Sequence, residues 1–76
     1  MSTFSENLKK QRQKKHLSQS DLGNLIGVTG VTIMRYEKGT REPKLDTIKK
    51  LANALQIPVS ELIDLNSTIM SKATKR

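Results

Sequence analysis

Apolar side chains recur every three or four positions along much of the chain, which is the spacing of helices with one buried face. Phe4 and Leu8 begin a narrow stripe that continues to Arg12, and charged residues occupy the other faces of this segment. The pattern predicts a first helix over residues 4–15.

A second helix is predicted to begin after Ser18. A serine followed three residues later by an acid, here Asp21, resembles a capping box, in which each side chain accepts a hydrogen bond from the other residue's backbone N–H. Apolar residues at helical spacing then form the face that we expect to point inward: Leu22, Leu25 and Ile26. Gly27 follows them and fits the C-terminal cap of the helix.

A third helix is predicted from Thr29 to the capping residue Gly39. At 100° per residue, one side of this helix carries Thr32, Ile33 and Tyr36. The opposite side carries Gly30, Val31, Met34, Arg35 and Lys38. Only Gly27 and Val28 separate the second helix from the third. So short a turn forces a sharp angle between the two helices, as in a helix-turn-helix.

A fourth helix is predicted over residues 45–55, after a loop that Pro43 interrupts. Its N-cap is poor because Lys44 stands where Ser or Asp is favoured. Its apolar residues recur at helical spacing: Leu45, Ile48, Leu51, Ala52 and Leu55.

A fifth helix of one or two turns is predicted at residues 59–63, after Pro58. Residues 66–76 are polar and have no period, so we expect a C-terminal tail or linker there. Residues 1–65 then form one domain, an all-α, compact five-helix bundle with short loops.

The net charge of the chain indicates which kind of partner the domain binds. Among 76 residues, 14 Lys and Arg stand against 7 Asp and Glu, which gives a formal net charge of +7 at pH 7. The basic residues concentrate in residues 1–16 and 35–50. A small and strongly basic domain points to a polyanion, with nucleic acid first and an anionic membrane surface or an acidic protein after it.

Several classes of function are disfavoured by what the sequence lacks. With no Cys and one His, it offers no zinc cluster or thiolate metal site. No apolar run approaches the roughly 20 residues of a membrane span, and the N-terminus lacks the apolar stretch of a signal peptide. There is no nucleophile–base arrangement, so we expect no enzyme and no cofactor. We expect a cytoplasmic, nucleoid-associated protein.

The motifs together resemble the phage-repressor and Cro type of helix-turn-helix domain. The resemblance rests on residues 17–22 (Leu-Ser-Gln-Ser-Asp-Leu), 26–29 (Ile-Gly-Val-Thr) and 31–43, with the spaced apolar residues of 45–55 after them. It implies a repressor-like fold and a sequence-specific transcriptional regulator. In that family the third helix enters the major groove of an operator in double-stranded DNA, often as a dimer, and the usual outcome is repression.

The resemblance also implies roles for individual residues. The base-readout set is Thr29, Gly30, Val31 and Arg35. The set that contacts the DNA backbone is Gln19, Thr32, Lys38, Thr40 and Arg41. Arg12 and Glu37 match a pair that forms a salt bridge between the first and third helices.

Two positions depart from the family pattern, which often has long polar or basic side chains there. Gly30 has no side chain, and we expect it to permit a closer approach of the helix. Val31 offers only an apolar contact, most naturally to a thymine methyl group. Because few side chains of this set can bind base edges, we expect sequence preference to depend on Arg35, Val31 and DNA shape.

A protein-interaction or antitoxin-like module with the same fold is the alternative function. Its contact patch is either Val31 with Met34, or an apolar set near the C-terminus: Ile57, Val59, Leu62 and Leu65. The same C-terminal set is our candidate homodimer surface. A dimerisation domain beyond this chain is the other route to a dimer.

Overall fold

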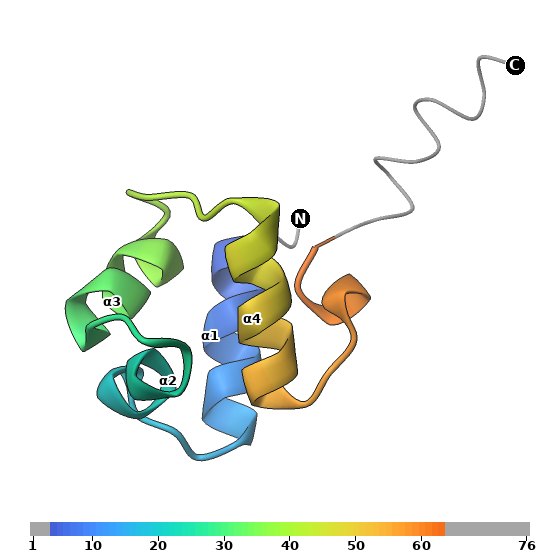
Figure 1. Cartoon of the computed structure of the whole chain (residues 1–76), viewed down its shortest axis with the longest axis horizontal. Helices are drawn as coiled ribbons and strands as arrows, with labels where there is room; N and C mark the ends of the chain where they lie inside the picture. The colour runs from blue at the N-terminus through green and yellow to red at the C-terminus, as the bar shows by residue number, and fades with distance from the viewer. Residues whose placement is uncertain (1–3, 64–76) are drawn as a thin grey trace, which may run out of the picture.

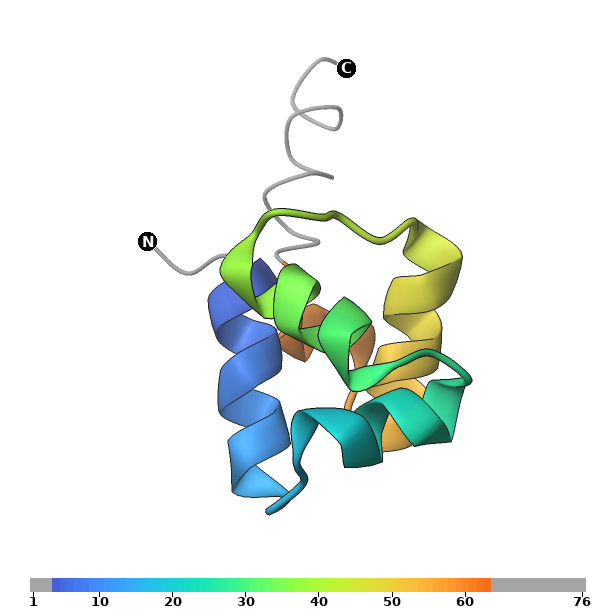
Figure 2. The ribbon, with the colours of Figure 1, turned by 90° about the vertical axis from the view of Figure 1, so that its left-hand side faces the viewer.

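The computed structural model describes residues 4–63, and these residues form an all-helical fold without strands (Figure 1). The elements follow one another as α1 (Phe4–Lys14), α2 (Gln19–Ile26), α3 (Gly30–Lys38), α4 (Leu45–Leu55) and the 3₁₀ turn η1 (Val59–Glu61). In Figure 2, helices α1 and α4 lie at opposite sides of the molecule, with α3 in front between them and α2 below α3.

The prediction of five helices was wrong, because the described residues contain four α-helices and a single 3₁₀ turn. In this turn the Glu61 N–H donates to the Pro58 carbonyl at 3.0 Å, and the Leu62 N–H donates to the Val59 carbonyl at 2.9 Å. Pro58 provides no side-chain cap. Three residues with i→i+3 bonds and no cap make a turn rather than a helix. The predicted tail and its boundary at residue 66 lie outside the described residues.

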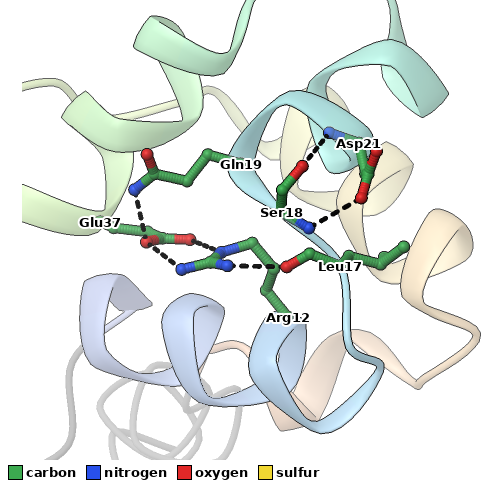
Figure 3. A network of polar contacts seen from close by, with 6 residues as sticks. All are labelled: Arg12, Leu17, Ser18, Gln19, Asp21 and Glu37. Carbon is green, nitrogen blue, oxygen red and sulfur yellow. Dashed lines mark hydrogen bonds and ion pairs between the residues drawn. The ribbon is translucent and has the colours of Figure 1, made fainter.

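The predicted capping box at the start of α2 is present (Figure 3). The Asp21 N–H donates to Ser18 Oγ at 2.9 Å, and the Ser18 N–H donates to Asp21 Oδ2 at 2.9 Å. At the other end Gly27 adopts the left-handed conformation with φ 81°, which a residue without Cβ reaches at low cost. Both ends of α2 therefore lie where the sequence predicts them.

Helix α3 is also bounded as predicted. The Thr29 hydroxyl accepts the Thr32 N–H at 3.2 Å, and Gly39 ends the helix with φ 79°. The weak start of α4 agrees with the sequence too, because Lys44 makes no side-chain capping bond. The sequence favours caps at Thr29 and Gly39 and disfavours one at Lys44. The structure has the first two caps and lacks the third.

The core is formed by apolar residues of the four helices and by the residue that follows η1: Leu8, Leu22, Ile33, Tyr36, Leu51, Ala52, Leu55 and Leu62. Two of the leucines predicted at apolar positions are instead on the surface. Leu25 is 58% exposed and Leu45 is 50% exposed. Both helices already fill their inner faces with other residues, such as Leu22 in α2 and Leu51 in α4.

The α2–α3 crossing depends on a glycine that the periodicity does not reveal. A Cβ on Gly23 would lie 2.6 Å from the Val28 carbonyl oxygen and 3.0 Å from the Thr29 oxygen. The Gly23 carbonyl also accepts the Val28 N–H at 2.9 Å. The backbone of the turn therefore lies directly on the middle of α2.

Replacing Gly23 by Val should destabilise the domain by at least about 2 kcal/mol, because the branched side chain meets backbone atoms that cannot rotate away. Urea unfolding followed by circular dichroism measures the effect. Asn24→Val is the matched control, since Asn24 is an exposed neighbour on the same helix. Equal losses in the two variants would contradict the close approach at Gly23.

The capping box also carries a pH dependence. Hydrogen bonds from Ser18, the backbone N–H first, hold the pKa of the exposed Asp21 carboxyl below its ordinary value. A lowered pKa stabilises the fold above the unfolded-state value of about 4, and this contribution is lost as the pH falls through the folded-state value.

The stability difference between the wild type and Asp21→Asn should therefore be full above about pH 5 and shrink as the pH falls below about 4. Urea midpoints between pH 2.5 and pH 7 measure this difference. Asp46→Asn is the control for removing one carboxylate from the first turn of a helix, because Lys44 makes no cap bond at the start of α4. A difference for Asp21→Asn that is constant with pH would contradict the assignment.

Candidate nucleic-acid interface

Helix α3 presents one face to the core and the opposite face to the surface. Ile33 and Tyr36 are buried, whereas Val31 is 52% exposed and Arg35 and Lys38 are exposed. Figure 2 views the molecule from the side on which α3 lies in front of α1 and α4. The structure thus exposes the side of α3 that the sequence predicts to be exposed. This outer face combines an apolar side chain with two cations.

Two threonines occupy the start of this helix. Thr29 is exposed, and its hydroxyl lies 3.1 Å from the hydroxyl of the half-buried Thr32. The first turn of α3 contains no acidic residue, and Arg35 and Lys38 lie in its last turn. The helix therefore carries positive charge at its C-terminal end and a pair of mutually hydrogen-bonded hydroxyl groups at its N-terminal end.

Gly30 has a structural role within the domain that the sequence analysis did not predict. A Cβ at this position would lie 2.8 Å from Ser20 Oγ and 3.1 Å from Ser20 Cα. Gly30 therefore lets the first turn of α3 approach α2, which is a contact within the domain.

A buried ion pair joins α1 to α3 (Figure 3). Arg12 donates through Nε to Glu37 Oε2 at 2.6 Å and through Nη2 to Glu37 Oε1 at 3.1 Å. Its Nη1 donates to the Leu17 carbonyl at 2.7 Å. The two side chains are only 11% and 4% exposed, so each charge relies on the other in place of water.

Gln19 joins the same network from the start of α2. Its Nε2 donates to Glu37 Oε1 at 3.1 Å, which ties the first turn of α2 to the last turn of α3 (Figure 3). An amide nitrogen has two hydrogens, so this bond leaves one for another acceptor. The sequence singled out Gln19 for a DNA contact but did not reveal Glu37 as its acceptor within the domain.

The loop after α3 holds the remaining predicted contacts. The Thr40 N–H and its hydroxyl both donate to the Arg35 carbonyl, at 3.1 Å and 3.3 Å. Arg41 is exposed. Both donors of Thr40 are thus engaged in closing the end of α3, whereas the guanidinium of Arg41 and the ammonium of Lys38 extend the basic surface of the helix.

A shallow hollow of about 280 Å³ lies where α2 meets α3. Its lining residues come from the first turn of α2 and the first half of α3: Gln19, Ser20, Thr29, Gly30, Val31 and Met34. It brings together four residues of the predicted interface and adds Ser20 and Met34, which the predicted site did not contain.

The candidate dimer surface at the C-terminus is only partly available. Leu62 is fully buried in the core, so its prediction as a contact residue was wrong. Ile57 and Val59 are partly buried and pack against the core cluster. Leu65 lies outside the described residues. The buried position of Leu62 follows from η1, which folds back onto the helices and is held by a bond from Asn7 Nδ2 to the Leu62 carbonyl at 3.0 Å.

Residues 4–63 contain no group of three or more His, Cys, Asp and Glu side chains placed to hold a metal ion. None of their helices is both long and apolar enough to cross a membrane.

Comparison with known proteins gives consistent matches. The sequence profile of the helix-turn-helix family matches residues 8–62. RstR of Vibrio cholerae, a cryptic phage CTXphi transcriptional repressor, is 38% identical over 95% of this chain. The chain covers 65% of the length of RstR, and 52% and 47% of the Bacillus subtilis regulators YqaE and RghR, so it spans about half to two thirds of these relatives.

Solved structures match the fold over most of the chain. The P22 c2 repressor, crystallised with a synthetic operator, has a TM-score of 0.78 and 28% identity, covering 84% of this chain and 97% of that one. The restriction-modification controller protein C.AhdI of Aeromonas hydrophila has a TM-score of 0.76 and 38% identity, covering 79% and 87%.

The same fold also occurs within a larger enzyme. Hydroxypropylphosphonic acid epoxidase from S. wedmorenis matches 79% of this chain with about a third of its own length, at a TM-score of 0.74 and 28% identity. Similarity of fold alone therefore does not decide function, and the exposed residues of α2 and α3 carry the argument.

Replacing either Arg12 or Glu37 by Met should cost about 3 kcal/mol of stability, because each change leaves the charge of the other residue buried without its opposite charge. The double variant Arg12→Met/Glu37→Met should lose much less than the sum of Arg12→Met and Glu37→Met, since it buries no unpaired charge. Urea unfolding of the four proteins in this cycle measures the coupling. Additive losses would contradict the role of the pair.

Proposed function

The chain belongs to the helix-turn-helix family, and on this basis we propose that it is a sequence-specific, double-stranded DNA-binding transcriptional regulator that acts as a repressor. The single observation that carries the proposal is the outer face of α3, where Val31, Arg35 and Lys38 are exposed on a helix whose other face is buried. The named function of RstR as a transcriptional repressor and the operator bound to the P22 c2 repressor support it.

In the proposed complex α3 enters the major groove and α2 crosses the DNA backbone. The net charge of +7 supplies the long-range attraction to phosphates. Because Glu37 is paired with Arg12, the acid nearest the end of the helix does not oppose that attraction as a free charge.

Arg35 is the main proposed base reader. Its guanidinium carries several N–H donors in a fixed plane, and two of them match O6 and N7 of guanine in the major groove. Val31 supplies an apolar contact one turn earlier on the same face, and Thr29 supplies a hydroxyl at the mouth of the helix. Gly30 contributes no side chain, so its part in readout is limited to its backbone.

The proposed backbone contacts surround this readout face. They are Gln19, Thr32, Lys38, Thr40 and Arg41. Lys38 and Arg41 are exposed cations and act on any sequence alike. The amide of Gln19 has one N–H for a phosphate beyond its bond to Glu37. Thr40 requires its hydroxyl to turn away from the Arg35 carbonyl before it donates to DNA.

We also propose that two copies bind two half-sites, in the cytoplasm and in association with the nucleoid. A single small domain rarely reaches the affinity of specific operators, and paired domains match half-sites about 34–36 Å apart. With Leu62 buried, the surface for self-association is reduced to the partly buried Ile57 and Val59, or it lies outside residues 4–63. Sedimentation equilibrium tests this, and a monomer at high concentration argues against self-association through this chain.

A protein-binding module remains the second candidate function. The observation in its favour is the exposure of Leu25 and Leu45, two large apolar side chains on α2 and α4. A complex with a protein that is insensitive to salt, together with no affinity for duplex DNA, would favour this function over DNA binding.

Arg35→Ala should weaken binding to the selected operator by roughly ten-fold to a hundred-fold, while binding to unrelated duplexes changes much less. Lys38→Ala should weaken binding to all duplexes alike. It should also reduce the salt slope, expected at about −4 to −5 per monomer, by about one unit. Fluorescence anisotropy titrations at four salt concentrations measure both effects.

Lys10→Ala is the charge-matched control, because it removes one exposed cation from α1, outside the proposed contact set. It should change the salt slope less than Lys38→Ala does. An Arg35→Ala variant that loses operator and unrelated DNA equally would remove Arg35 from base readout.

A further inference from the structure

A second shallow hollow, of about 260 Å³, lies between α2 and α4, and α3 contributes no residue to it. Its lining residues are Leu25, Ile26, Lys50, Asn53 and Ala54. In Figure 2 the C-terminal end of α2 lies beside α4 at the lower right of the molecule. None of the five residues belongs to the proposed DNA contact set, so DNA binding through α3 leaves this α2–α4 hollow unused.

The floor of the α2–α4 hollow is apolar. Leu25 is 58% exposed, more than either Val31 or Leu45, the other large apolar side chains on the surface of residues 4–63. Ile26 and Ala54 are half-buried beside it and pack against the core cluster. Because the side chain of Ala54 is a single methyl group, α4 leaves this space beside α2 open. A large apolar side chain of a partner can therefore be buried there.

The rim of the hollow carries one cation and one amide. Lys50 and Asn53 are exposed and three residues apart, so they are neighbours on the surface of α4. The Lys50 ammonium makes no ion pair within residues 4–63, although Asp46 lies one turn before it on α4. On α2 the carboxylate of Asp21 accepts the Ser18 N–H in the capping box. The ammonium and the amide are therefore available to a carboxylate of a partner.

The size and chemistry of the hollow together indicate its occupant. Typical small-molecule sites have volumes of about 300–1,000 Å³, so this open hollow of about 260 Å³ suits a side chain better than a free ligand. We propose that it docks an acidic amphipathic helix of a partner protein. One large apolar side chain of that helix lies between α2 and α4, and a carboxylate within one turn of it pairs with Lys50.

Charge complementarity favours this occupant over a second copy of the chain and over DNA. A symmetric pair of copies joined at the hollow brings the two Lys50 ammonium groups together, on molecules that each carry a net charge of +7. A DNA backbone offers phosphates to Lys50 but no large apolar side chain to cover Leu25. An acidic amphipathic helix supplies both the opposite charge and the apolar group.

The first experiment selects partners by their chemistry. A yeast-displayed library of helical peptides of about four turns, with random surface positions, is sorted against the wild-type chain. Enriched peptides should carry Asp or Glu three or four positions from a large apolar residue. Amide chemical shifts of the chain then locate the bound peptide, and the changes should centre on the residues that line the hollow: Leu25, Ile26, Lys50, Asn53 and Ala54.

The second experiment measures the affinity of a selected peptide for matched variants by fluorescence anisotropy. Lys50→Glu should weaken binding by at least about ten-fold, because it places a like charge against the carboxylate. Lys49→Glu makes the same change of net charge at an exposed neighbour outside the hollow and should weaken binding by less than about three-fold. These side chains are exposed, so the fold is retained.

A second pair of variants tests the apolar floor. Leu25→Ala should weaken binding by roughly ten-fold, because it removes the wall against which the apolar side chain of the peptide packs. Leu45→Ala is the matched control, since it removes an exposed apolar side chain from α4 outside the hollow. Its affinity for the peptide should equal that of the wild type.

Several results would overturn the inference. A library that enriches no pairing of an acid with an apolar residue excludes the proposed occupant. Shift changes centred on α3 mean that the peptide imitates DNA, and equal losses for Lys50→Glu and Lys49→Glu mean attraction by net charge alone. Self-association that Leu25→Ala abolishes assigns the hollow to a second copy. None of these results bears on DNA binding by α3, which is tested separately.

Discussion

The arrangement of the first three helices depends on one buried contact, the ion pair between Arg12 and Glu37. Glu37 accepts hydrogen bonds from Arg12 of α1 and from Gln19 of α2, while Arg12 also reaches the Leu17 carbonyl in the turn between these helices. Because the pair is almost inaccessible to water, it is stable only in this geometry. The pair therefore fixes the C-terminal end of α3 relative to the two helices that support it.

The other end of α3 is fixed by close backbone approach. Gly23 lets the turn before α3 lie directly on α2, Gly30 lets the first turn of α3 approach Ser20 of α2, and the Thr29 cap sets the first turn of α3. Because an ion pair holds one end of α3 and a glycine contact holds the other, the residues of its outer face are not needed to keep the helix in place. That division is what makes the exposed Val31 and Arg35 available for a partner.

Much of this fold is predictable from the sequence because it follows local rules. The caps at Ser18, Gly27, Thr29 and Gly39 depend on residues a few positions apart, and all four are where the sequence places them. What local periodicity does not determine is which of two apolar neighbours is buried. Leu25 faces outward because eight residues of α2 have room for only one narrow inner face.

Contacts between residues far apart in the sequence are likewise not predictable from local periodicity. The burial of Leu62 depends on η1 folding back to α1, where Asn7 binds the Leu62 carbonyl and Gln11 binds Glu61, across 55 and 50 positions of sequence. The outward face of α3 was predictable from 100° periodicity, whereas the bond between Gln19 and Glu37 and the hollow beside it required the packing of two helices.

The central claim is that the exposed face of α3 reads DNA sequence. Selection of bound duplexes from a random DNA library, at one fixed salt concentration, tests it most directly. The account predicts an enriched site, repeated as two inverted half-sites about one helical turn apart if two copies bind together. Weak binding that falls with salt and enriches no sequence would contradict it.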